Sequence, residues 1–126
     1  MGLVAQSAAV LAGLIHLLIF AMESVIFARP EVHRRFRTAP QDLAAVQPWA
    51  YNQGFYNLFL AIGALAGVVI AHASRPLVGR TLALFACACM LGAALVLITS
   101  NRRMARGAMM QGMAPLVALV AAYFGY

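Results

Sequence analysis

Four long apolar segments constrain the fold of this 126-residue chain more than any other feature. They lie at about 3–27, 50–73, 77–100 and 105–125, and each is long enough to cross a bilayer as a helix. Hydrophobic residues make up 64% of the chain and charged residues only 10%, much less charge than a soluble domain carries. The sequence therefore predicts an all-α fold, in which residues 1–126 form one polytopic membrane domain, a bundle of four transmembrane helices.

The first apolar segment differs from a secretory signal peptide. It lacks a basic region at its beginning, and its apolar run is longer than the hydrophobic part of such a peptide. We therefore expect this segment to be retained as a membrane span.

All nine basic residues are arginines, and they lie in the connections between the apolar segments or in the first turn of the segment that follows. In a four-span protein the first connection, at about 28–49, and the third share one side of the membrane. Because arginine-rich short loops face the cytoplasm, we expect this side to be cytoplasmic and both termini to be extracytoplasmic, in a bacterial inner membrane. This side has seven arginines, namely Arg29, Arg34, Arg35, Arg37, Arg102, Arg103 and Arg106, and the other side has Arg75 and Arg80.

The partners expected for these arginines are the anionic headgroups of membrane lipids, and not a nucleic acid. Binding of an anionic substrate is the alternative. Because Pro30, Pro40 and Pro48 interrupt the first connection, it cannot be one continuous helix. We expect a short basic interfacial helix at 31–37, one or two turns at 41–47, and Trp49 at the membrane interface.

Two ionisable residues, His16 and Glu23, lie on one face of the first segment. Seven residues of helix separate them by roughly 10 Å, so they can line one groove without hydrogen bonding to each other. An acid inside a membrane span is costly to bury and usually faces a partner, a cavity or a ligand. Glu23 is therefore the main candidate for a functional residue. Small residues share this face, namely Ala5, Ala9, Ala12 and Gly13.

The second segment begins with four polar side chains in six residues. Asn52 and Tyr56 share a helix face with Gly63 and Gly67, and two further amides, Gln53 and Asn57, flank that face. On the fourth segment Gln111 lies at the same depth. The predicted arrangement is a cytoplasm-facing polar pocket beneath a closely packed outer half.

The sequence also resembles a known family. HLLIFAMESVIF at 16–27, followed by a basic loop and then WAYNQGFYNLFLAIG at 49–63, is similar to the DUF1304 family of small four-span bacterial membrane proteins. The resemblance covers most of the chain, and NQGFYN at 52–57 is its most specific part. It implies the four-span fold and these polar residues, but no reaction.

Three functions remain open for this pocket. One is binding, with proton-coupled transport, of a small amphipathic or cationic ligand, since one membrane carboxylate suffices for it. The second is an enzyme that acts on a lipidic substrate, with Glu23 and His16 as acid and base. The third is a purely structural polar cluster. In the first, the candidate ligand-binding residues are His16, Glu23, Asn52, Gln53, Tyr56, Asn57 and Gln111.

We expect neither a metal nor a cofactor, because no paired histidine motif is present and Cys87 and Cys89 point to nearly opposite sides of a helix. The third segment has small residues on two faces. A face of small residues permits close helix contact, so we expect a homo-oligomer in which this helix also contacts a second subunit. The two faces are Thr81, Ala88 and Gly92, and Ala83, Cys87 and Ala94.

Overall fold

The computed structural model describes residues 1–73 and 75–126, and every regular element in these ranges is a helix. Ser74, in the connection between the second and third predicted spans, lies outside the described residues. The predicted all-α fold is confirmed, since four helices are long and apolar enough to cross a membrane. They are α1 Leu3–Phe20 with its continuation η1 Ala21–Val25, α3 Leu43–Ala73, α4 Pro76–Ser100 and α5 Ala105–Phe124.

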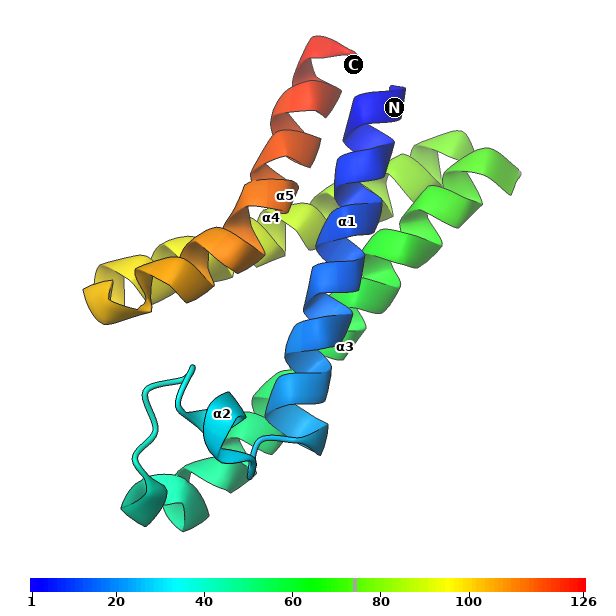
Figure 1. Ribbon diagram of the computed structural model, residues 1–126. Coiled ribbons are helices and arrows are strands. Elements are labelled where there is room, and N and C mark those ends of the chain that lie inside the picture. The colour runs from blue at the N-terminus through cyan, green and yellow to red at the C-terminus, as the bar shows by residue number, and fades with distance from the viewer. Residues whose placement is uncertain (74) are drawn as a thin grey trace.

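The four long helices form a ring in which α1 contacts α3 and α5, and α4 contacts the same two helices (Figure 1). Both termini lie at one end of this bundle, where the Ala5 N–H donates to the Tyr126 carbonyl over 3.2 Å. The short helix α2, Pro30–His33, lies at the other end. Figure 1 also shows that α5 bends along its length, and Pro115 lies inside this helix.

Alanine dominates the centre of the bundle. Ala9 and Ala12 of α1, Ala64 of α3 and Ala118 of α5 are all 0% exposed. Such short side chains let the helix backbones approach closely, which is how membrane helices gain packing contacts without a hydrophobic driving force. The small face predicted for the first segment is therefore the buried face of α1.

The connection between α1 and α3 is more helical than the sequence suggests. The helix α3 begins at Leu43 and runs through Pro48, so it starts before residue 50, where we expected the span to begin. Proline removes one backbone donor, but the carbonyl left free, that of Ala44, belongs to an exposed residue at which water can bind. The basic helix expected at 31–37 is limited to α2, and 40–42 form a single 3-10 turn, η2 Pro40–Asp42.

The two small faces of α4 have different environments. Ala83, Cys87 and Ala94 are buried within the bundle. Thr81, Ala88 and Gly92 are exposed, so in this chain no helix covers that face over the described residues.

Self-association through the exposed face of α4 therefore stays a prediction. Ala88→Leu would place a large side chain where a second subunit must approach closely, so we expect it to convert an oligomer into a monomer. Native mass measurement in mild detergent tests this, with Ala93→Leu, the same change at an exposed position of α4 outside this face, as the control. A wild-type chain that is monomeric in several lipid-like conditions would contradict the prediction.

Candidate functional site

Glu23 lies in a π-helical segment, η1, that extends α1 by five residues. The Ile26 N–H donates to the Ala21 carbonyl five residues before it, at 3.0 Å. Single π-helical turns of this kind are rare and occur frequently at functional sites. The wider turn sets the direction of the Glu23 side chain, which is only 9% exposed.

The partner of Glu23 is Asn57 of α3, one of the four polar residues at 52–57. Asn57 is 6% exposed, and its Nδ2 donates to Glu23 Oε2 over 2.7 Å. The same amide nitrogen donates to the Gln53 carbonyl over 3.2 Å, which orients it. No residue described by the structure donates to the second carboxylate oxygen, Oε1, so that oxygen is free to accept from a ligand.

Close contact between η1 and α3 holds this pair in place. A side chain at Gly54 would collide with Ser24 Oγ and would lie 3.1 Å from Glu23 Cβ. Ser24 Oγ in turn donates to the Tyr51 carbonyl over 2.8 Å. The absence of a side chain at Gly54 is therefore what allows Glu23 to reach Asn57.

His16 is buried on the same face of α1 but makes a different contact. It is 1% exposed, and its Nδ1 donates to the Ala12 carbonyl of its own helix over 2.9 Å. Among the described residues it has no hydrogen bond to Glu23, as the spacing of two helical turns predicts. The two residues therefore share a face and not a contact.

The remaining candidates do not join Glu23 in an enclosed pocket. Asn52 and Gln53 are exposed, Tyr56 is 57% exposed, and Gln111 is half-buried on α5. The face predicted for the second segment is rotated in the structure, because the glycine that packs against η1 is Gly54. The sequence contained a signal for the face of α3 that is buried in the structure, namely small side chains spaced three and four residues apart. The buried residues of this face are Gly54, Asn57, Ala61, Ala64 and Gly67.

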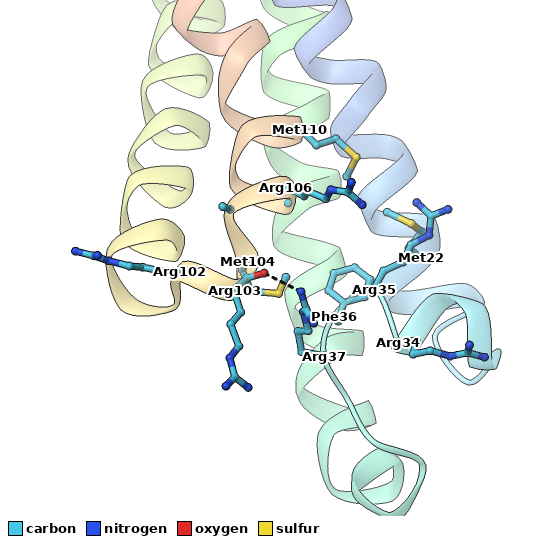
Figure 2. A pocket seen from close by; sticks show the side chains of 12 residues that line it. Met22, Arg34, Arg35, Phe36, Arg37, Arg102, Arg103, Met104, Arg106 and Met110 are labelled. Atoms are coloured by element: carbon cyan, nitrogen blue, oxygen red, sulfur yellow. Dashed lines mark hydrogen bonds between the residues drawn. The ribbon is translucent and has the colours of Figure 1, made fainter.

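A cavity of about 680 Å³ lies at the α2 end of the bundle, beside α1 rather than between α1 and α3 (Figure 2). We call it the arginine pocket. It combines the first connection with η3, Arg102–Met104, and the start of α5. Met22, next to Glu23, lines it, whereas Glu23 faces α3. Its charged residues are Arg34, Arg35, Arg37, Arg102, Arg103 and Arg106.

The arginine pocket has no acidic residue in its lining. The chain has only three acids, and Glu23, Glu31 and Asp42 all lie elsewhere. The positions of the arginines in the sequence predict that the two arginine-rich connections share one side of the membrane, but they do not predict a common cavity. No metal site is evident either, since no group of three His, Cys, Asp or Glu side chains clusters in 1–73 and 75–126.

The chain matches the family described as protein of unknown function (DUF1304) over residues 10–123. No significant match to a curated protein or to a solved structure was found. The matched range contains η1, both members of the Glu23–Asn57 pair and every residue of the arginine pocket. The match extends over nearly the whole chain, and the protein therefore belongs to the DUF1304 family of unknown function.

Proposed function

We propose that this protein binds a small amphipathic ligand within the membrane, with the Glu23 carboxylate as the polar contact. One observation carries the proposal. A nearly buried acid in a π-helical segment has one oxygen bonded to Asn57 and the other free of partners among the described residues. Because acids are rare inside membrane spans and usually serve a ligand or a pathway, the free oxygen is best explained as a ligand contact.

The ligand expected for this site has a hydrogen-bond donor, and preferably a positive charge, on an apolar body. A carboxylate accepts from an ammonium group more strongly than from a neutral donor. The surroundings of Glu23 suit an apolar body, since Phe20 and Phe55 pack edge to face nearby with ring centroids 5.3 Å apart. Tyr56 directly precedes Asn57 and is 57% exposed, so it places a hydroxyl on the neighbouring, exposed side of α3.

Proton coupling follows from the same carboxylate. Protonated Glu23 is neutral and no longer attracts a cationic headgroup, so ligand and proton compete for one site. Affinity for a cationic ligand should therefore fall as the pH is lowered. This competition is the elementary step of proton-coupled transport.

Glu23→Gln tests the proposal, because it keeps the shape of the side chain and removes the charge. The probe is decylamine, an amphipathic ammonium, titrated calorimetrically into the protein in an uncharged detergent at several pH values. We expect the wild type to bind more weakly at low pH, and Glu23→Gln to bind at least tenfold more weakly with little pH dependence. Glu31→Gln, an exposed acid outside the spans, should behave as the wild type.

The competing hypothesis is that Glu23 only fixes the packing of η1 on α3, and the close contact at Gly54 favours it. Under that hypothesis Glu23→Gln retains a hydrogen bond to Asn57 and binds the probe as the wild type does, while Glu23→Ala lowers the melting temperature. These two results together would show that Glu23 has a structural role and does not bind a ligand. An enzyme acting on a lipidic substrate has less support, since His16 bonds to its own helix.

A further inference from the structure

We propose that the arginine pocket is a binding site for a phosphoryl group, and that its apolar lining receives the chain of a phosphorylated amphiphile. The proposal is independent of Glu23, which faces α3 and does not line this cavity.

The charge of the cavity is the first reason. Six of the seven arginines at this end of the bundle line one cavity, and no acid in its lining offsets them. Like charges repel, so a protein that needed arginine only to orient its spans would gain nothing by gathering them. Several arginines that line one cavity with no acidic residue among them are instead what an anion-binding site requires.

The shape of the cavity is held by specific contacts, and this is the second reason. Arg37 Nη2 donates to the Arg103 carbonyl over 3.3 Å, which ties the first connection to η3. Arg37 adopts a left-handed backbone, φ 58°, which is uncommon for a residue other than glycine. Buried His33, whose Nδ1 donates to the Thr38 carbonyl over 2.9 Å, closes this turn. The connection is therefore fixed over the cavity before any ligand arrives.

The side chains differ in direction. Figure 2 shows Arg37 and Arg106 extending into the space between the first connection and α5, with Arg35 beside Met22 on the opposite wall. Arg34 and Arg102 point away from that space. Guanidinium groups on opposite walls can bind two faces of one phosphoryl group, and arginine forms such paired hydrogen bonds better than lysine.

The apolar part of the lining is the third reason. Met22, Phe36, Met104 and Met110 complete the cavity, and Met110 lies on the side of the spans. Methionine adapts to irregular apolar surfaces, which suits an alkyl chain. A volume of about 680 Å³ is within the usual range for a small-molecule site. A headgroup can thus occupy the arginines while its chain follows α5 toward the membrane interior.

The experiment compares three probes by calorimetry in dodecyl maltoside, a detergent without phosphate. Dodecyl phosphate carries both parts of the proposed ligand, inorganic phosphate only the anion, and dodecyltrimethylammonium a chain with the opposite charge. We expect dodecyl phosphate to bind at least tenfold more tightly than inorganic phosphate. Binding of the cationic probe, which is expected at Glu23 and not in this pocket, should be the same in the wild type and in the arginine variant described next. If the two phosphates bind with equal affinity, the pocket binds a phosphoryl group, but its ligand is a free anion and the proposed role of the apolar lining is wrong.

The decisive variant is Arg35→Gln/Arg37→Gln/Arg106→Gln, which should weaken dodecyl phosphate binding at least tenfold. Arg29→Gln is the control, since it removes one positive charge at the same end of the bundle but outside the pocket. If both proteins lose affinity equally, or if neither does, the pocket is not a site and the proposal is overturned.

A second variant covers the case in which the triple variant fails to fold. Arg35→Gln/Arg106→Gln keeps the Arg37–Arg103 contact and must still weaken dodecyl phosphate binding at least threefold. Glu23→Gln should bind dodecyl phosphate normally, so this proposal and the function proposed for Glu23 can fail separately.

Discussion

Gly79→Ala is expected to destabilise the bundle by about 2 kcal/mol or more, although alanine favours helices over glycine. A Cβ on Gly79 of α4 would collide with the Ala71 backbone nitrogen and would lie 2.5 Å from the Gly67 carbonyl oxygen. Both are backbone atoms of α3, so the methyl group can be accommodated only if the two helices separate. Reciprocally, a Cβ on Gly67 would lie 2.5 Å from the Ala83 backbone nitrogen of α4. Thermal unfolding in detergent, followed by circular dichroism, measures the loss.

Gly92→Ala is the matched control for this prediction. It makes the same change in the same helix, but beyond the adjacent residues and backbone of α4 itself no atom of the described residues lies within 4 Å of the added Cβ. Within one chain helix propensity alone then acts, so for the monomer we expect a stability equal to or up to about 1 kcal/mol above that of the wild type. Equal melting temperatures for Gly79→Ala and Gly92→Ala would show that the backbones of α3 and α4 are not in close contact at Gly79.

Asn57→Leu is expected to destabilise the protein by about 1–3 kcal/mol. Leucine is similar in size to asparagine but cannot donate a hydrogen bond. The change leaves Glu23 Oε2, now bonded over 2.7 Å, without its donor in a largely buried position. The penalty arises from the unpaired carboxylate rather than from lost packing.

A double-mutant cycle separates this penalty from other effects of the substitution. In Glu23→Met/Asn57→Leu both polar partners are replaced by apolar groups of similar size, and such replacements are often nearly neutral. We therefore expect the double variant to be more stable than Asn57→Leu alone, with a coupling energy of about 1 kcal/mol or more. If the stability lost in the double variant equals the sum of the losses in Glu23→Met and Asn57→Leu, the Glu23–Asn57 hydrogen bond contributes little.

The sequence alone was sufficient for the class of fold, because the number and length of the apolar segments leave few alternatives in a bilayer. It also indicated the buried face of α1, since a spacing of three and four residues between small side chains corresponds to one side of a helix. Glu23 and Asn57 were both among the candidate residues, and the structure joins them. The orientation of the termini and the ligand-binding role of these residues stay predictions.

What only the tertiary structure decided is how segments distant in the chain meet. The rotation of α3 about its axis depends on the contact of Gly54 with Ser24, between residues thirty positions apart. The pairing of Gly67 with Ala83 likewise depends on the crossing of two helices. The arginine pocket requires Arg37 to reach the Arg103 carbonyl across sixty-six residues of chain.

Local periodicity shows which side of a helix is suited to burial, but it contains no information on which neighbouring helix that side will contact or at what height along the bundle. These choices come from the packing of all four helices together, and here they determine that one acid is paired and six arginines share a cavity.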